Sequence, residues 1–242
     1  MKLAGKNPIY ERMRLNPRSI KKIYLQQGFS DATYVRHKAK KLRIPLIEIL
    51  PGKMQKIGRG KNTQGILADV DDFGYVAFSD LLEQAGKKKR TLVFLDGIMD
   101  PQNLGAILRS LGSLGRFSLV IPTHDAVGVT ETVLRIASGG ENHVPVALVG
   151  NLNKAIQEAK EDGYTIVGAV TSDGVSIYDV QLPPRVGLVI GSEQKGIRPG
   201  ILKSLDVQTT IPMLVASMSL NVASATALYA YEIIRQNEQR KK

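Results

Sequence analysis

The chain has 242 residues and carries 33 Lys and Arg against 22 Asp and Glu, a formal net charge of +11 at pH 7. No apolar run reaches the roughly 18–20 residues that span a bilayer, and the N-terminus lacks the apolar segment of a secretory signal. The absence of cysteine excludes disulfides and thiolate chemistry, and the three histidines have no metal-ligand spacing. These features predict a cytoplasmic, metal-independent protein that binds a polyanion.

The positive charge is concentrated in the first third of the chain. Residues 1–90 hold 20 basic and 8 acidic side chains, a net of +12, whereas residues 91–242 hold 13 and 14, a net of −1. We therefore expect two domains, a basic one over residues 1–86 and a nearly neutral one over residues 91–242. The charge block at residues 87–90 (KKKR) is typical of a solvated linker between them.

The basic domain is expected to be a small α/β unit. Apolar residues recur at helical spacing in residues 18–25 and again in residues 34–42, which predicts two helices. Residues 52–65 are rich in glycine and lysine and indicate an exposed basic loop. Short strands are predicted at residues 44–50, 66–70 and 75–78.

After residue 90 the pattern changes to alternating strands and helices, which is typical of a parallel sheet with helices on both faces. The run Leu92–Leu95 is continuously apolar, as expected of a strand buried on both faces. A helix is predicted over residues 103–114. Further strands are expected at residues 118–121, 144–149, 165–170, 186–190 and 207–211, and further helices at residues 130–138, 151–161 and 219–236.

Three strand ends carry unusual residues, and in open parallel sheets ligands bind beyond the carboxyl ends of the strands. The first is followed by Asp100-Pro101, a helix-start signal. Gly105 costs about 1 kcal/mol relative to Ala inside a helix, so another group is expected to approach closely there. Arg109 is the only charged residue between Asp100 and Arg116. It is interpreted either as a salt-bridged residue that packs on the core or as a contact to an anion or RNA.

The second stretch, Gly191–Pro199 (GSEQKGIRP), directly follows an apolar strand. It is not a phosphate-binding P-loop, because Ile197 and Arg198 stand where that motif has Lys and Ser or Thr. The chain contains no G-x-G-x-x-G, which disfavours ordinary dinucleotide binding and the open Rossmann class of methyltransferase. Glu193 is interpreted as a helix cap or as a group that orients a substrate hydroxyl.

The third stretch, Ile211–Ala225, begins where a strand ends at a proline and continues through an apolar loop. Ser219 and Asn221 stand at the start of the helix that follows, and Ser219 taken alone is best explained as its N-cap. The small residues at 223–227 leave room for another backbone to lie against this helix.

Taken together and in this order, three sequence motifs resemble those of the SpoU (TrmH-like) family of S-adenosylmethionine-dependent RNA 2′-O-ribose methyltransferases. The motifs are D-P-x-N-x-G-A-I-x-R, G-x-E-x-x-G and I-P-M…S-L-N-V. The chain is most similar to the branch that modifies guanosine in ribosomal RNA. The basic segment 1–83 is similar to the substrate-binding domain of that branch, which is related to ribosomal proteins of the L7Ae/L30e type. The resemblance implies an α/β fold of the SPOUT type, with a parallel sheet, a C-terminal trefoil knot and a homodimer whose active sites are completed across the interface.

The resemblance also implies roles for individual residues. Residues 216–218 stand where relatives often have a glycine- and serine-rich sequence. This departure affects the flexibility of the loop and not a catalytic position. The family's cofactor-binding positions correspond to Gly191, Ile211, Met213 and Leu220. Its catalytic positions correspond to Asn103, Arg109, Glu193, Ser219 and Asn221.

The expected function is therefore S-adenosyl-L-methionine-dependent 2′-O-methylation of RNA, with a guanosine of 23S-type ribosomal RNA as the target. Family proposals often make the first-motif arginine, here Arg109, the general base, yet a guanidinium stays protonated at neutral pH. We therefore expect Arg109 to bind a phosphate or to stabilise the developing alkoxide. Alternatives left open are a transfer RNA or antibiotic-resistance methyltransferase of the same family and, in another class, a non-catalytic RNA-binding assembly factor.

Overall fold

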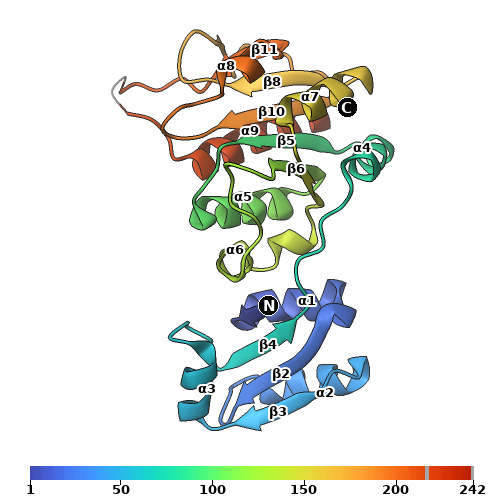
Figure 1. Ribbon diagram of the computed structural model, residues 1–242, viewed down its shortest axis with the longest axis vertical. Helices are drawn as coiled ribbons and strands as arrows, with labels where there is room; N and C mark the ends of the chain where they lie inside the picture. Colours follow the sequence, from blue (N-terminus) through green and yellow to red (C-terminus); the bar gives the residue numbers. More distant parts are fainter. Residues whose placement is uncertain (216–217, 241–242) are drawn as a thin grey trace.

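The computed structural model describes residues 1–215 and 218–240, which form two α/β units placed end to end (Figure 1). The N-terminal unit contains a four-stranded sheet in the order β1-β4-β2-β3, in which β4 runs antiparallel to β1 and β2. Strand β3 pairs in parallel with β2 and forms one edge of the sheet. The strands are β1 (Lys2–Ala4), β2 (Ile20–Gln26), β3 (Leu46–Ile49) and β4 (Ile66–Val70), and the helices are α1 (Lys6–Leu15), α2 (Ala32–Leu42) and α3 (Pro51–Gly58).

Three predictions for this unit are wrong; the strand expected at residues 75–78 is described below, and the other two each have a physical reason. Residues 18–25 do not form a helix; most of them belong to strand β2. A register shift between Ile20 and Lys22 places Ile20 and Ile23 on the buried side although they are three residues apart, which imitates helical spacing. The predicted loop 52–65 begins with helix α3, because Pro51 starts the first turn and Met54 is buried.

The second unit is a seven-stranded sheet within the described residues, in the order β7-β6-β5-β10-β8-β11-β9, and every pairing in it is parallel. This confirms the predicted parallel α/β architecture; among the strands only the short β9 was not expected, and the short helix α8 (Pro199–Leu202) was not expected either. The strands are β5 (Thr91–Asp96), β6 (Phe117–Pro122), β7 (Val146–Val149), β8 (Thr165–Ala169), β9 (Val175–Ser176), β10 (Val186–Gly191) and β11 (Val207–Thr210). The helices are α5 (Pro101–Leu114), α6 (Glu131–Ala137), α7 (Leu152–Glu161), α8 (Pro199–Leu202) and α9 (Val222–Gln239).

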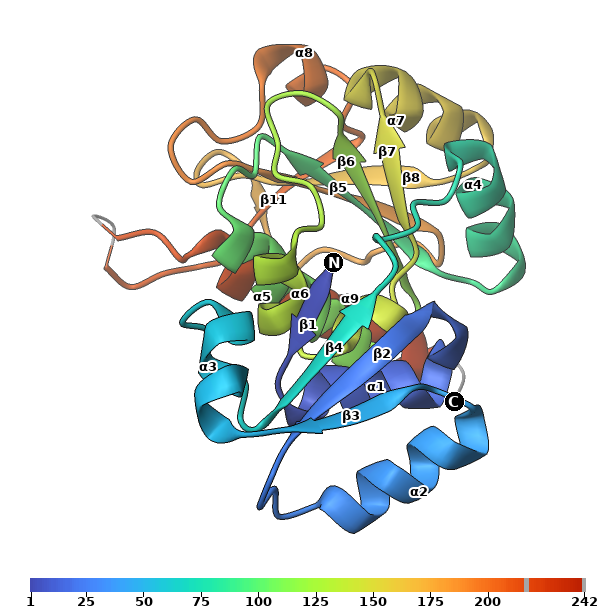
Figure 2. The ribbon, with the colours of Figure 1, turned by 60° about the horizontal axis from the view of Figure 1, so that its bottom comes forward.

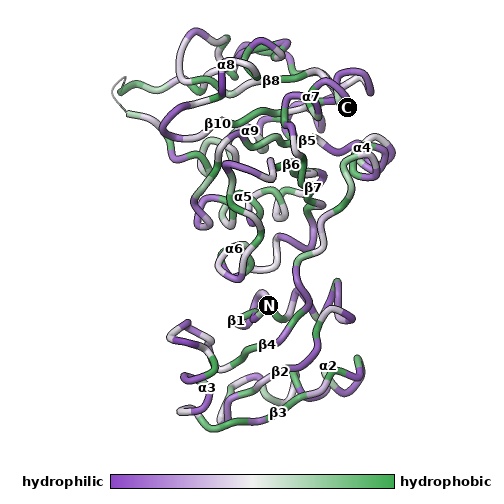
Figure 3. The backbone as a smooth tube through the Cα atoms, in the orientation of Figure 1, coloured by the Kyte–Doolittle hydropathy of each residue, from purple (hydrophilic) through white to green (hydrophobic). Residues whose placement is uncertain are grey.

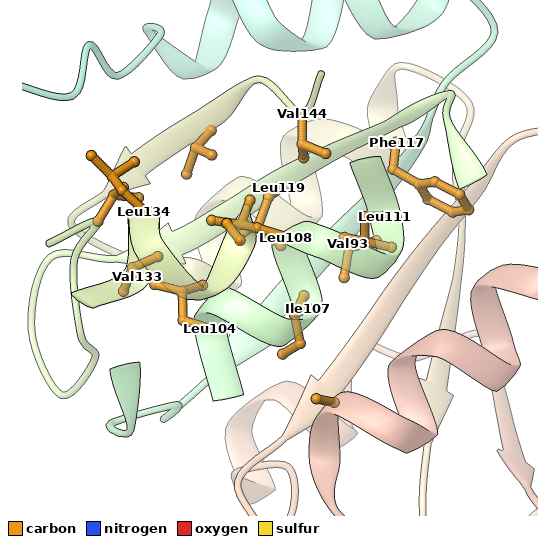
Figure 4. Packing of buried hydrophobic residues seen from close by; sticks show 14 of the residues in the cluster. Val93, Leu104, Ile107, Leu108, Leu111, Phe117, Leu119, Val133, Leu134 and Val144 are labelled. Atoms are coloured by element: carbon orange, nitrogen blue, oxygen red, sulfur yellow. The ribbon is translucent and has the colours of Figure 1, made fainter. Parts of the chain in front are cut away.

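Helices cover both faces of this sheet, so its strands are apolar along their whole length. On one face Val93 packs with the apolar side of α5 and with α9 (Figure 4). On the other face Leu92 and Phe94 pack with residues of α4 (Phe78–Lys87) and α7. Strands β6 and β7 are accordingly among the most hydrophobic segments of the chain (Figure 3). Each strand end therefore emerges from a rigid, fully covered sheet.

Helix α4 follows the first sheet in the sequence and packs on one face of the second sheet. Its buried Leu81 and Ala85 belong to the apolar cluster of the second unit. Residues 75–78 form no strand beyond a single bridge of Val76 to Ala147. Arg90 is not a solvated linker residue, because it is partly buried and its guanidinium donates to two backbone carbonyls of the second unit. The domain limits at residues 86 and 91 stay a prediction. No helix in the described part of the chain is long and apolar enough to cross a membrane.

Candidate active site

The three stretches singled out in the sequence meet at the carboxyl edge of the sheet, where β5 and β10 lie side by side. Gly191 at the end of β10 is in register with Asp96 at the end of β5. From β5 the chain continues to β6 and β7 on one side, whereas β10 and β8 lie on the other. This reversal is the topological switch point, at which open parallel sheets form their binding crevice.

Glu193 joins all three stretches through one carboxylate oxygen. The Asn221 side-chain amide donates to Glu193 Oε1 at 2.6 Å and to Asn103 Oδ1 at 2.9 Å. The Asn103 amide donates to the same Glu193 oxygen at 3.4 Å, and the backbone N–H of Val222 does so at 3.2 Å. Residues that lie 118 positions apart in the chain are thereby held in one hydrogen-bonded cluster.

Helix starts explain how two of these side chains are positioned. Asp100 accepts from the backbone N–H of Gln102, as its capping signal predicts, and so fixes the first turn of α5 that carries Asn103. Helix α9 begins at Val222 with Asn221 as its N-cap, so the interpretation of Ser219 as the cap is wrong. Because Glu193 accepts from a free N–H of that first turn, its cap interpretation is compatible with a role in the cluster.

The Gly191–Arg198 loop is folded tightly onto the end of β10. Ser192 and Gly196 exchange two backbone hydrogen bonds, at 3.2 and 2.8 Å, which close the turn that carries Glu193. A Cβ at Gly191 would overlap the backbone of Gly196, so only glycine fits there. Buried Asp96 anchors the far end of the loop, because it accepts from the Arg198 N–H at 2.8 Å and forms an ion pair with the Arg198 guanidinium at 2.6 Å.

A cavity of about 530 Å³ opens beside this loop, between the ends of β8 and β10 and the segment that leads into α9. Its floor includes the buried Tyr229, whose pKa is raised by burial and whose hydroxyl donates to the carbonyl of Thr209 at 2.8 Å. The phenol therefore stays neutral. The walls include six of the residues predicted from the sequence: Gly191, Glu193, Ile211, Met213, Ser219 and Leu220.

Comparison with known proteins identifies the family of the chain. The SpoU rRNA Methylase family matches residues 90–231, which contain every predicted site residue. The chain belongs to this family. The family described as RNA 2′-O ribose methyltransferase substrate binding matches residues 2–76, which correspond to the N-terminal unit. As a member of the SpoU family, the chain is an RNA methyltransferase.

Individual relatives extend the comparison over the whole chain. The 23S rRNA (guanosine-2′-O-)-methyltransferase RlmB of Neisseria meningitidis is 32% identical over 97% of both chains. An uncharacterised tRNA/rRNA methyltransferase of Synechocystis is 37% identical, and the alignment covers 76% of this chain but only 48% of that relative. The solved SpoU methyltransferase AviRb from Streptomyces viridochromogenes, in complex with AdoMet, shares the fold with a TM-score of 0.81 at 21% identity, over 98% of this chain and 90% of that one.

Arg109 is the SpoU motif residue that the structure does not bring into the cluster. It is exposed on α5, six positions after Asn103, and therefore lies on a different side of that helix. The Arg109 guanidinium has no hydrogen bond or ion pair to any described residue. The salt-bridge interpretation therefore finds no support in the described part of the chain. The close approach expected at Gly105 is confirmed, and the neighbour is Ile136 of α6 rather than a ligand.

Sequence reasoning missed two features of the site. Asp96 ends a buried strand, and an acidic residue at that position is a signal that the sequence shows. Its role in anchoring the loop could not be predicted, because it depends on Arg198, 102 residues away. Residues 171–173, which follow β8, also line the cavity. Their position after a parallel strand would have placed them at the same edge. Of the departure at residues 216–218, Ala216 and Ser217 lie outside the described residues.

Proposed function

We propose that the chain transfers a methyl group from S-adenosyl-L-methionine to the 2′-hydroxyl of a guanosine in large-subunit, 23S-type ribosomal RNA. The observation that carries this proposal is the convergence of the three stretches, which places the Glu193 cluster at the mouth of one cavity. The substrate is supported by the alignment with the Neisseria 23S rRNA enzyme, which extends over nearly all of both chains.

The cavity fits the cofactor in size and chemistry. About 530 Å³ lies within the range of cofactor sites, which are mostly apolar with a few placed polar groups. Ile211, Met213 and Leu220 offer apolar surface for an adenine ring, and the Gly191 turn offers backbone groups. When bound, S-adenosylmethionine supplies a methyl group on a positively charged sulfonium. The nearby Glu193 carboxylate suits such a cation.

The chain's own residues orient the ribose. Glu193, Asn103 and Asn221 hold one another, so their polar atoms are fixed before RNA arrives, which lowers the entropic cost of aligning the hydroxyl. Ser219 lines the cavity beside them. Arg109, exposed and unpaired among the described residues, binds a phosphate of the target nucleotide or stabilises the developing alkoxide. A phosphate or a water molecule accepts the proton.

The N-terminal unit captures the RNA. Its exposed basic side chains on α2 and α3 present positive charge to phosphates, which dominate nucleic-acid affinity. Exposed Tyr34, which meets Tyr10 edge to face, offers an aromatic surface on the same unit. The mixed sheet flanked by helices supports the proposed L30e-like fold of this unit.

Two further parts of the proposal concern the C-terminal segment. Exposed apolar side chains gather on the loop before α9 and on α9 itself, namely Leu214, Met218, Leu228 and Tyr231, and we assign this surface to a second copy of the chain in a homodimer. The trefoil knot is supported by the shared fold and by the position of Ile211, Met213 and Ser219–Val222 beside the Gly191–Arg198 loop.

The test is to incubate the chain with ribosomal and transfer RNA and methyl-labelled S-adenosylmethionine, and to map the 2′-O-methylated nucleotides. Label in one guanosine of large-subunit RNA is the expected result. If only transfer RNA is labelled, the substrate is transfer RNA and not the proposed ribosomal RNA. The absence of both label and thermal stabilisation by the cofactor would favour the non-catalytic assembly factor.

A further inference from the structure

The two units are joined by a built interface that the proposed chemistry does not use. Strand β1 and helix α1 of the N-terminal unit lie against α6 and the short helix η2 (Gly140–Asn142) of the second unit (Figure 2). One continuous cluster of buried apolar side chains extends from the N-terminal unit into α5 and α6. The interface is therefore packed in the way a domain interior is packed, rather than being a transient surface contact.

A buried ion pair lies at the centre of this interface. The Arg12 guanidinium on α1 donates to Glu141 Oε1 on η2 at 3.0 Å, and the two side chains are 5% and 0% exposed. The Asn142 amide donates to the same carboxylate oxygen at 3.0 Å. Desolvating a pair of charges costs several kcal/mol, and removing one partner leaves an uncompensated buried charge. Such a pair is a strong determinant of one docked orientation.

Peripheral contacts fix the orientation around this pair. On one side Glu131 of α6 accepts from the backbone N–H of Lys2 at 2.6 Å and forms an ion pair with Lys61. On the other side Glu11 of α1 lies 3.3 Å from His143. Three separate carboxylates therefore hold the units together, and rotation of one unit against the other would break all of these contacts.

The connecting segment is also fixed. The Tyr75 hydroxyl accepts from the backbone N–H of Val129 at 2.8 Å, and the Val76 N–H donates to the carbonyl of Val146 at 2.9 Å. Residues 71–77 therefore do not act as a free tether, which would let the N-terminal unit sample many orientations.

The ion pair is close to the helix that carries the predicted catalytic residues. Gly140, the neighbour of Glu141, lies so near α5 that a Cβ on it would be 2.8 Å from the Cα of Arg109. A Cβ on Gly112, one turn further along α5, would be 2.6 Å from the Gly140 carbonyl oxygen. Because neither position has room for a side chain, η2 rests directly on the backbone of α5.

We propose that Arg12 and Glu141 are positioning residues for methyl transfer. They set the orientation of the RNA-capturing unit against α5, so that RNA held by the basic surface presents its target ribose at the correct distance from Asn103 and Arg109. This inference rests on the proposed function, because the distance matters only if RNA bound by one unit is modified by the other.

The experiment compares four full-length single variants, and the double variant Arg12→Met with Glu141→Gln, with the unmodified chain. Arg12→Met and Glu141→Gln each remove one charge of the buried pair. Arg12→Lys keeps the charge but loses the guanidinium fork. Arg18→Met is the matched control, because Arg18 lies shortly after the same helix, is exposed and has no ion pair among the described residues. Thermal unfolding and S-adenosylmethionine affinity establish that each variant is folded and loaded.

The structural readout is a distance between the units. The chain has no cysteine, so spin labels at Gln55→Cys on α3 and Glu161→Cys on α7 are unique. Dilution into unlabelled chain restricts the measured distances to single chains. We expect a narrow distribution in the unmodified chain and in Arg18→Met, and a broad one in Arg12→Met and Glu141→Gln.

The kinetic readout separates positioning from capture. With RNA affinity unchanged, kcat is expected to fall about tenfold or more in Arg12→Met and Glu141→Gln, because small misplacements cost large factors in rate. Arg12→Lys should recover part of this loss, and the double variant should resemble the single ones because they share one pair. A narrow distance distribution and a normal kcat in folded Arg12→Met would overturn the inference. Failure of the unmodified chain to methylate any RNA would instead refute the proposed function, while the distances still report on docking.

Discussion

The two units differ in their net charge and in the type of sheet that they contain. The N-terminal unit has a mixed four-stranded sheet in which Ile47 of the edge strand β3 and Leu50, just after that strand, are exposed, and it belongs to the segment with a net charge of +12. The second unit has a fully parallel sheet covered on both faces and a net charge near zero over residues 91–242. A sheet with one open edge suits a surface for binding, whereas a covered parallel sheet concentrates its function at the strand ends.

Near-neutrality in the second unit also has a chemical consequence. A strongly positive crevice would repel a sulfonium cofactor, whereas RNA needs positive charge for capture. Placing the two requirements on different units lets each be met without weakening the other. The arrangement then depends on correct alignment of the units, which the buried Arg12–Glu141 pair provides.

The division of RNA capture and chemistry between the two units is tested most severely at Glu193, the residue to which we assign the second unit's chemistry. Glu193→Ala removes the acceptor shared by Asn103, Asn221 and the first turn of α9. We expect kcat to fall about 100-fold, because the cluster loses its geometry, while RNA affinity is unchanged. Single-turnover methylation and filter binding measure the two quantities. An equal loss of RNA affinity would show that capture and chemistry are not divided between the units.

Arg109→Lys tests a predicted catalytic residue that lies outside the Glu193 cluster and does not line the cavity. Lysine keeps the positive charge but cannot make the bidentate contact of a guanidinium with a phosphate. We expect kcat to fall about tenfold, with S-adenosylmethionine affinity unchanged, since the loss of a charge-assisted contact costs about 1.5–3 kcal/mol. Wild-type rates in this variant at every pH would contradict the phosphate-clamp role.

Neutralising the basic unit should affect binding rather than chemistry. Lys40→Gln with Lys41→Gln removes two exposed charges at the end of α2. RNA affinity should fall severalfold, and the slope of log affinity against log salt should decrease by about 1.4–1.8, because each phosphate contact contributes about 0.7–0.9. The matched control is Lys154→Gln with Lys203→Gln, two exposed charges on the second unit. Equal effects of the two pairs would mean that the RNA also binds the second unit's surface.

Sequence patterns predicted the second unit far better than the first. Its strands are buried on both faces, so their apolar runs were visible, and their carboxyl ends had to meet at one edge. In the N-terminal unit the bulge in β2 changed the spacing of Ile20 and Ile23, and a short helix was hidden in a glycine- and lysine-rich segment. Local spacing is a weaker guide where strands are short, irregular and half-exposed.

The candidate site was predictable in its residues but not in its contacts. The cavity-lining positions came from a resemblance of motifs, which carries no distances. The pairings of Asp96 with Arg198 and of Arg12 with Glu141 join residues 102 and 129 positions apart. No local pattern relates residues at such separations, because only tertiary packing brings them together.

The smallest expected effect is the pH dependence of the contact between the two units. Burial alone would raise the pKa of Glu131, but the Lys61 ammonium and the Lys2 backbone N–H outweigh it and lower this pKa below its ordinary value. A lowered pKa in the folded state means that the carboxylate contributes stability above its ordinary pKa and that this contribution is lost as the pH falls through the lowered value. Acid should therefore loosen the junction of the units.

We expect the thermal stability of the unmodified chain to decrease between about pH 5 and pH 3, and Glu131→Gln to show a smaller decrease, because it has no charge to lose there. Glu158→Gln is the control, since Glu158 is a partly exposed helix residue whose only ion pair within the described part of the chain is a long one, at 3.9 Å, to Lys154. The spin-label distance between the units should broaden over the same pH range in the unmodified chain. If Glu131→Gln and the unmodified chain titrate identically, this carboxylate does not contribute to docking, and the alignment of the two units rests on the Arg12–Glu141 pair and the Glu11–His143 contact.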